Sequence, residues 1–260
     1  MPVTQFLIFK FPTVVLGVML VGGVVLSLVA GLLILRHFLP YHVRLREHHD
    51  VAGPILGVLG AVYAVLLAFV VVTVWQSFDR TNANVQQEAN YLAGIYWDAE
   101  AFAPAFRQEV ASLAREYREA VVAYEWKTMA QGKMSPEVEA ITNRIWALYT
   151  TYEPRTPKEQ AFFNESVQKL NSFRELRRQR LMDSQTGLHP LLWFVLIVGM
   201  FATISLTFLF GMENLKVHVV MVVLLALTIT LILFTILLLD FPFTGDISIS
   251  AEPFRQLLLN

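Results

Sequence analysis

Four arginines stand close together in the stretch LNSFRELRRQRL, residues 170–181: Arg174, Arg177, Arg178 and Arg180. Three roles compete for this cluster. The arginines can flank a membrane span and set its topology, which needs no further assumption. They can also form a site for an anionic lipid headgroup, or a basic vestibule that concentrates anions.

A second polar group is the sequence EHHD at residues 47–50, with His37 and His42 nearby. A helical metal site needs ligands at spacings such as i and i+4, and this group lacks that spacing. The chain also has no cysteine, which excludes disulfides and thiolate ligands. We therefore expect a solvated loop here and no metal site.

The sequence carries none of the common catalytic motifs. It has no G-x-S-x-G, no H-E-x-x-H, no phosphate-binding loop and no dinucleotide fingerprint. We expect no enzyme activity, no catalytic residue and no cofactor. The net charge of −1 gives no reason to expect a nucleic-acid partner.

The distribution of charge indicates which elements position these residues. Of the 260 residues, 55% are apolar, and 29 of the 41 charged side chains lie between Asp79 and Leu188. Long uncharged runs stand on either side of this segment. Such a pattern is typical of an integral membrane protein with one polar domain, so we expect the lipid bilayer as a partner.

Four runs reach the roughly 20 residues that cross a hydrocarbon core of about 30 Å. A lone span must be helical, because lipid offers no hydrogen bonds to the backbone. The predicted fold is all-α, with two transmembrane hairpins and a helical insert between them. The runs are residues 11–35, 54–78, 190–212 and 219–239. The predicted domains are a first hairpin (1–78), a helical domain (79–188), a second hairpin (189–239) and a docking tail (240–260).

Local signals place two helix starts within the insert. Ser135 precedes Pro136 as an N-cap would, and Thr156 with Glu159 forms a capping box. The tail after residue 240 is too apolar for a solvated segment. We expect it to dock on the helical domain or on a neighbouring protomer, with an interfacial position on lipid as the alternative.

Charges near the span ends predict the orientation. Seven lysines and arginines lie on the side of the termini and the insert, against four on the other side. By the positive-inside rule, we expect a multi-pass protein of the inner (plasma) membrane with its termini and helical domain in the cytoplasm.

The second span carries two different stripes when it is read as a helix. One consists of small residues, which let helices approach closely in lipid: Gly57, Ala61, Ala64 and Ala68. The other lies about 130° away, at about 100° per residue, and changes from apolar to polar: Val62, Leu66, Phe69, Thr73 and Gln76. Around a symmetry axis, the second stripe lines a pore with Leu66 and Phe69 as its constriction. The alternative is that it faces lipid or another helix.

Six stretches carry a family resemblance, in order, over nearly the whole chain after about residue 50. They are GAVYAVLLAFVVVTVW (60–75), NVQQEANYLAGIY (84–96), REAVVAYEWKTMAQG (118–132), LNSFRELRRQRL (170–181), LHPLLWFVLIVGM (188–200) and LLLDFPFTGDISISAEPF (237–254). Together they resemble the bacterial bestrophin-like membrane proteins, a domain family of unassigned function that is distantly similar to bestrophin chloride channels.

The resemblance has implications for assembly and for the pore. Bestrophins are pentamers whose second transmembrane helix lines a hydrophobic neck, so it implies a homo-oligomer, pentameric by analogy, with residues 62–76 at the pore. Their acidic calcium clasp has no counterpart in this sequence, so calcium gating is not implied. Two functions follow: an ion channel that passes small anions, or a non-conducting membrane scaffold or sensor whose helical domain binds a cytosolic partner.

Overall fold

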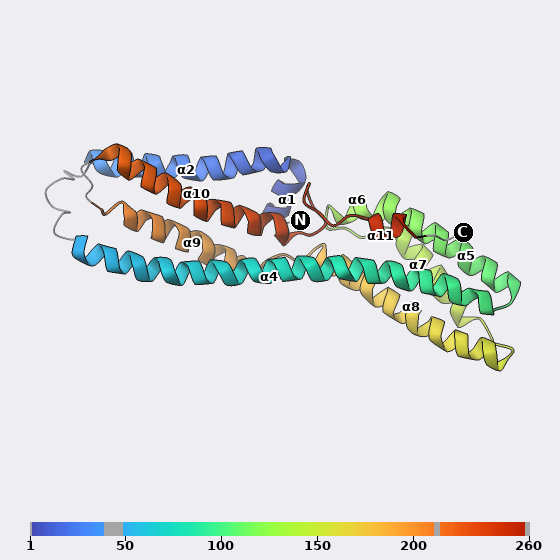
Figure 1. Cartoon of the computed structure of the whole chain (residues 1–260). Helices are drawn as coiled ribbons and strands as arrows, with labels where there is room; N and C mark the ends of the chain where they lie inside the picture. The colour runs from blue at the N-terminus through green and yellow to red at the C-terminus, as the bar shows by residue number, and fades with distance from the viewer. Residues whose placement is uncertain (1, 39–48, 211–213, 258–260) are drawn as a thin grey trace. The chain divides into compact units, whose positions relative to one another are not determined.

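The chain folds into helices. The computed structural model describes residues 2–38, 49–210 and 214–257, and within them the regular structure is helical, with no strand (Figure 1). The predicted all-α fold with four long apolar helices is therefore confirmed. Two compact units are present. The membrane unit comprises residues 11–76 and 188–240, and the helical unit comprises residues 1–10, 77–187 and 241–260 as far as they are described.

Four helices of the membrane unit are long and apolar enough to cross a bilayer: α2 (Thr13–Phe38), the first half of α4 (His49–Asp98), α9 (Pro190–Thr207) and α10 (Leu215–Asp240). Helices α2 and α10 run side by side (Figure 1). Each helix contributes to one apolar core, which includes Leu32, Leu67, Leu196 and Val222. Lipid-facing and core-facing residues are equally apolar, so the fit of side chains between helices must hold the unit together.

A close fit joins α4 to α9. The Tyr63 hydroxyl donates a hydrogen bond to the Leu196 carbonyl oxygen at 2.8 Å, and its ring lies over Gly199. A Cβ atom at Gly199 would stand 2.5 Å from the Tyr63 Cε2 atom. Gly199 therefore provides the space that the aromatic ring occupies.

The end of α10 is fastened to the start of α9 by Asp240. Its Oδ1 accepts a hydrogen bond from the Leu188 backbone N–H at 2.6 Å, and its Oδ2 accepts one from the Trp193 indole N–H at 3.4 Å. The sequence marks Asp240 only as the residue that ends the fourth span. The structure adds that its carboxylate joins the two helices of the second hairpin.

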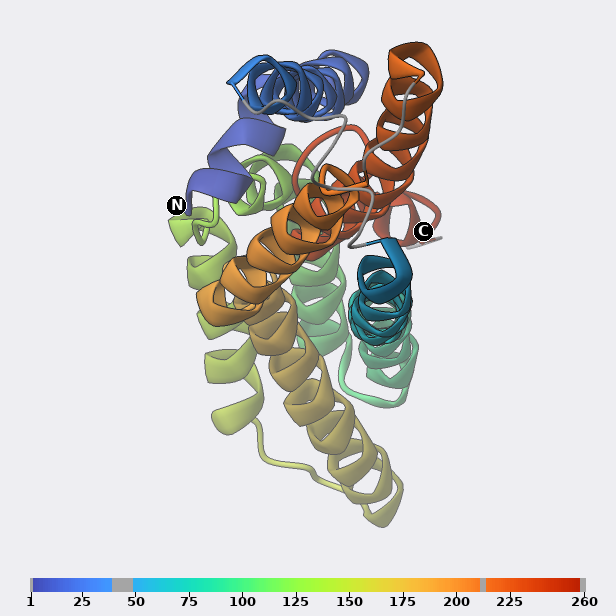
Figure 2. The same cartoon turned by 90° about the vertical axis from the view of Figure 1, so that its left-hand side faces the viewer.

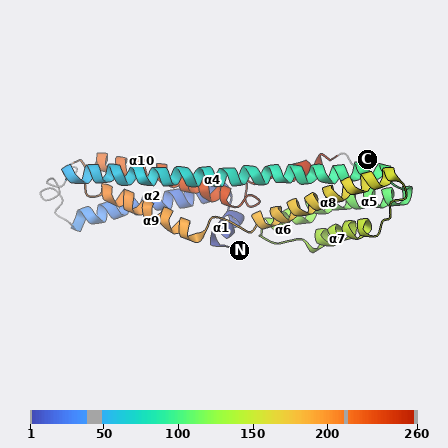
Figure 3. The same cartoon turned by 90° about the horizontal axis from the view of Figure 1, so that it is seen from below.

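The helical unit is built from the second half of α4 and the segments that follow it. These are a 3₁₀ turn (Ala99–Ala101), α5 (Pro104–Ala120), a π-helical turn (Val121–Glu125), α6 (Trp126–Met129), α7 (Pro136–Thr150) and α8 (Pro157–Asp183). Helices α5 and α8 lie beside the second half of α4, and α7 packs against α5 and α8 on the side away from α4 (Figure 2 and Figure 3). Both predicted caps are present: the Ser135 hydroxyl accepts from the Val138 N–H, and the Thr156 hydroxyl accepts from the Glu159 N–H.

The ends of the chain also belong to the helical unit. The segment after residue 240 buries Phe241, Phe243 and Phe254, and contains the short helix α11 (Glu252–Arg255). The Trp126 indole N–H donates to the Ile249 carbonyl oxygen at 2.9 Å. The helical unit of the same chain thus covers most of the apolar side chains of this segment, while Ile247 stays exposed.

The division into units differs from the sequence-based domains at the N-terminus. Residues 1–10, which contain α1 (Val3–Lys10), group with the helical unit and not with the first hairpin. Gln5 contributes to this grouping, because it is fully buried and its amide donates to the Ser184 carbonyl oxygen at 3.1 Å and to the Thr244 hydroxyl at 3.3 Å. One side chain thereby joins three segments that are distant in sequence.

The contact between Tyr63 and Gly199 leads to a stability prediction. The substitution Gly199→Ala should lower the free energy of unfolding by about 1–3 kcal/mol, because the new methyl group overlaps a ring that a hydrogen bond holds in place. Thermal unfolding of the purified protein in detergent measures the effect. The matched control is Gly22→Ala in α2, where an added Cβ meets nothing within 4 Å. Equal melting temperatures for the two variants would contradict the prediction.

Candidate functional site

The membrane-spanning half of α4 has three faces, about 120° apart at about 100° per residue. One face packs within the membrane unit and consists of Tyr63, Leu67, Val70 and Val74, each 5–7% exposed. The two stripes found in the sequence form the other faces. The packed face has the spacing i, i+4, i+7, i+11, so the same periodicity would have revealed it in the sequence.

The proposed pore stripe is uncovered in the single chain. Val62 is 64% exposed and Phe69 is 70% exposed, while Leu66 is partly buried. Thr73 and Gln76 continue the exposed stripe toward the second half of α4. The Thr73 hydroxyl donates to the Phe69 carbonyl oxygen at 2.8 Å, which satisfies its hydrogen bonding within the helix.

The small-residue stripe is also uncovered. Gly57, Ala61, Ala64 and Ala68 are all exposed, and a Cβ at Gly57 would meet nothing within 4 Å. Ala64 and Ala68 form one wall of an apolar groove of about 550 Å³, whose other walls come from α9 and α10. The packing of α4 inside its own chain therefore depends on the Tyr63 face, and the small residues are left for other contacts.

The four arginines of residues 174–180 do not form one site. Arg177 is 5% exposed and Arg180 is fully buried in the helical unit. Each is held in ion pairs with glutamates of the same unit, so neither guanidinium is open to a lipid headgroup or to bulk anions. For Arg177 and Arg180 the prediction of an anion or headgroup site is wrong, because acidic partners elsewhere in the chain already occupy them.

Arg180 is the centre of a buried ion network. Its Nε lies 2.7 Å from Glu88 Oε2, and its Nη2 lies 2.9 Å from Glu88 Oε1 and 3.0 Å from Glu125 Oε2. The Met129 sulfur accepts from Nη1 at 3.0 Å, and the Trp126 ring stacks 4.9 Å from the guanidinium carbon. The guanidinium is thus satisfied at its edge and covered on its face.

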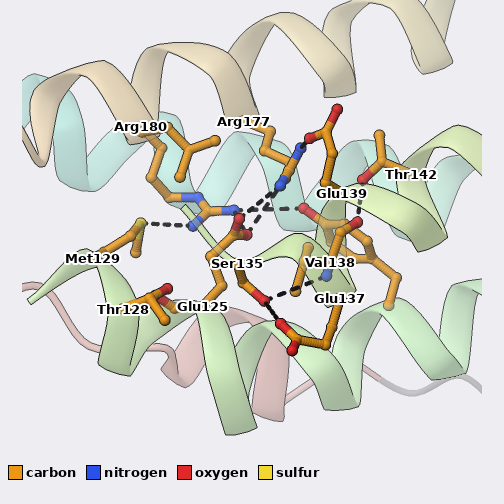
Figure 4. Close-up of polar contacts among 12 residues, drawn as sticks. Glu125, Thr128, Met129, Ser135, Glu137, Val138, Glu139, Thr142, Arg177 and Arg180 are labelled. Atoms are coloured by element: carbon orange, nitrogen blue, oxygen red, sulfur yellow. Dashed lines mark hydrogen bonds and ion pairs between the residues drawn. The ribbon is translucent and has the colours of Figure 1, made fainter. Parts of the chain in front are cut away.

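Arg177 extends the network to α7. Its Nη2 lies 2.7 Å from Glu125 Oε1, and its Nη1 pairs with Glu139 Oε2 (Figure 4). Glu125 therefore bridges two arginines one turn apart on α8. It is the last residue of the π-helical turn, and π turns of this kind are frequent at functional or strained positions in helices.

Sequence reasoning missed the acidic members of this network. Glu88 lies on the buried face of α4 with Val85, Ala89 and Leu92, and all four are at most 2% exposed. A charge among buried apolar positions requires a buried partner. That interruption of the apolar pattern was the available signal, although it does not identify Arg180 as the partner.

Burial and pairing shift two pKa values in the network. Desolvation alone would lower the pKa of Arg180, but its attraction to Glu88 and Glu125 raises the value well above the usual one. Burial raises the pKa of Tyr117 well above its usual value, and the nearby Glu88 charge adds to the shift. The Tyr117 hydroxyl donates to Glu88 Oε1 at 2.7 Å.

The other two arginines remain near the surface of α8. Arg178 is paired with Glu175 at 2.6 Å and 2.9 Å, and the hydrogen bonds of Arg178 and Gln179 lower the pKa of Glu175 to about 2. Arg174 lies over the Trp146 ring, with its guanidinium carbon 4.5 Å from the ring centre. Of the four arginines in the predicted anion site, Arg174 and Arg178 are therefore the two that lie near the surface.

No group of three or more His, Asp and Glu side chains in the described part of the chain is arranged to hold a metal ion. The predicted solvated loop at EHHD falls outside that part: His42, Glu47 and His48 are not among the described residues, nor are the side chains of His49 and Asp50.

The four apolar helices and the helical second unit define an α-helical protein of the membrane class, with four helices long and apolar enough to cross a bilayer. The Bestrophin-like domain model matches residues 21–254, and the chain belongs to this family. It is thus a membrane protein of the bestrophin type, as the resemblance of the six sequence stretches implied. No curated protein and no solved structure matches the chain.

The buried network leads to a test that compares two neighbouring arginines. The substitution Arg180→Met should lower the free energy of unfolding by about 3–5 kcal/mol, because it leaves the buried Glu88 carboxylate without its cation and Glu125 with Arg177 alone. Arg178→Met is the matched control and should change stability little, because Arg178 is 61% exposed and pairs only at the surface. Chemical unfolding of the purified full chain measures the stability of both variants. Similar losses of unfolding free energy in the two would show that the buried Arg180 contributes no more than the exposed Arg178.

The shifted pKa of Tyr117 leads to a pH prediction. In the unfolded chain the Tyr117 phenol loses its proton near pH 10, whereas in the folded chain its pKa is higher. The contribution of this group to the free energy of unfolding is therefore complete below about pH 10 and declines above it. The variant Tyr117→Phe should lose melting temperature less steeply than the wild type above pH 10. Tyr124→Phe, at an exposed position, should follow the wild type. Parallel curves for all three proteins would show that Tyr117 carries no such linkage.

Proposed function

We propose that this chain is the subunit of a homo-oligomeric ion channel of the bestrophin type that passes small anions. Its pore is lined by the α4 stripe of Val62, Leu66, Phe69, Thr73 and Gln76. The single observation that carries the proposal is the three-faced α4 helix, of which only one face is covered in its own chain.

The two uncovered faces suit different surroundings. Small residues favour close helix contacts in lipid, so the Gly57–Ala68 stripe suits the helix of a neighbouring copy. The Val62–Gln76 stripe lies about 120° away and becomes polar toward one end. A ring of such helices would place one stripe at the subunit contacts and the other around the axis. The number of subunits, five, is proposed by analogy with bestrophins.

The absence of charge in the spans favours passive conduction. Coupled transporters and proton pumps usually carry ionisable groups at membrane depth. The uncharged runs 54–78 and 190–212 contain none. A narrow ring of Leu66 and Phe69 can act as a gate because water leaves a sufficiently small apolar constriction.

We further propose that the protein lies in the inner membrane, with its termini and helical unit in the cytoplasm. The support is the excess of lysine and arginine on that side of the spans, seven against four.

A non-conducting scaffold or sensor is the second candidate. The observation that favours it is the size of the helical unit, which has its own aromatic core and its own ion network. Such a protein would bind a cytosolic partner through residues 79–188 and show no ion flux.

An anion-flux measurement distinguishes the two functions. Purified protein in liposomes should release chloride, and Phe69→Ala should change the rate several-fold because it widens the proposed constriction. Phe194→Ala is the matched control, since it removes an equally exposed phenylalanine from α9. Absence of flux in the wild type, or equal effects of the two substitutions, would count against the channel.

A further inference from the structure

We propose that the helical unit holds a binding site for a small oxyanion, a phosphate or carboxylate group, in a cavity beside Arg174. The inference goes beyond the channel and does not depend on it, because it concerns a ligand bound by residues of the helical unit alone.

The cavity lies between α7 and α8 and has a volume of about 430 Å³. This is within the range of small-ligand sites in proteins, about 300–1,000 Å³. Polar side chains line it from both helices: Glu139 and Thr142 from α7, and Asn171, Arg174, Glu175, Arg177 and Arg178 from α8. A hydrogen-bonding solute therefore fits it better than an apolar one.

Arg174 is the residue that selects an anion. Its guanidinium lies over the face of the Trp146 ring at 4.5 Å, a contact that uses the flat face of the group and leaves its N–H donors at the edge. Within the described parts of the chain, these donors make no ion pair or hydrogen bond. Arg174 is thus held in place by the indole while its hydrogen-bonding capacity stays unused.

The acids of the cavity are already matched with cations. Glu139 pairs with Arg177, and Glu175 pairs with Arg178. Among the described residues, Arg174 has no acidic partner of this kind, so its charge is the one that a ligand can neutralise. A planar guanidinium with free edge donors binds phosphate or carboxylate through two parallel hydrogen bonds.

A neighbouring turn of α8 supplies one further donor, Asn171, whereas the Arg178 guanidinium is already paired with Glu175. Asn171 stands three residues before Arg174 and Arg178 stands four residues after it, so all three side chains share one face of the helix. Asn171 is exposed, and its amide can donate to a ligand oxygen beside the guanidinium. The recognition surface is therefore a strip of α8, with α7 as the opposite wall.

Calorimetric titration of the full chain with inorganic phosphate tests the site. The protein should be in nanodiscs of phosphatidylcholine, at constant ionic strength maintained with chloride. The wild type should bind in a saturable way, and Arg174→Gln should weaken binding by about tenfold or more, as loss of a charge-assisted pair of hydrogen bonds does. Arg144→Gln is the matched control: it removes an exposed arginine of α7 that pairs with Glu116 and does not line the cavity.

Tryptophan fluorescence locates the ligand independently. Phosphate should change the emission of the wild type, and Trp146→Phe should abolish that change while calorimetric binding persists, because phenylalanine keeps an aromatic face under Arg174. Absence of saturable binding in the wild type, or equal binding by Arg174→Gln and Arg144→Gln, would overturn the proposal.

The same assay distinguishes a free solute from a lipid headgroup as the source of the oxyanion. Nanodiscs that contain phosphatidylglycerol should lower the apparent affinity for inorganic phosphate if the headgroup reaches the cavity, and Arg174→Gln should remove that competition. An unchanged phosphate affinity in both lipids, with binding still dependent on Arg174, would identify the ligand as a soluble anion. Either result supports the site.

Discussion

The helical unit depends on one buried cation. Arg180 is fully enclosed, and removal of a charge from water costs several kcal/mol even after the surroundings relax. The cost is offset only if carboxylates approach with good geometry. Glu88 comes from α4 and Glu125 from the π-helical turn, while Arg180 itself is on α8. The three elements must therefore meet in one arrangement, and a shift of any of them would leave a charge unpaired.

The membrane unit follows a different rule. Its interior and its surroundings are equally apolar, so burial from water does not select one packing over another. Shape selects it instead. The Tyr63 ring occupies the space above Gly199, and its hydroxyl ends on the Leu196 carbonyl. Just before the start of α9, the Leu188 backbone N–H donates a hydrogen bond to the Asp240 carboxylate. Close fit and a few directed hydrogen bonds replace the charge network of the helical unit.

Much of the fold could be predicted from local pattern. The four apolar runs are long enough to admit only helices, and the caps at Ser135 and Thr156 depend on residues three positions apart. Local pattern could not predict which of the arginines are buried or which carboxylates they pair with. Arg180 is 92 residues from Glu88, and no spacing rule connects them. A cluster of four cations in sequence thus separated into two buried and two near the surface.

The faces of α4 show a second limit. All three stripes have helical spacing, so periodicity alone cannot decide which one contacts the same chain. The answer depends on the partner surface, namely the gap at Gly199 that receives Tyr63. In the proposed channel the pore stripe would contact neighbouring copies and not its own chain. The observation that concerns this contact is the exposure of Phe69 and of the residues in line with it.

The π-helical turn at Val121–Glu125 also constrains how long its segment can be. A π turn accommodates one residue more than an α-helical turn between the same two ends, and each residue of an α-helix rotates the next by about 100°. Loss of one residue would restore a regular helix and turn every later side chain of the segment away from its partner, Glu125 among them. Within these five positions, substitutions that keep Glu125 leave the later side chains facing their partners. A one-residue deletion would rotate those side chains away from them. The number of residues in this turn is therefore as much a part of the ion network as the charges themselves.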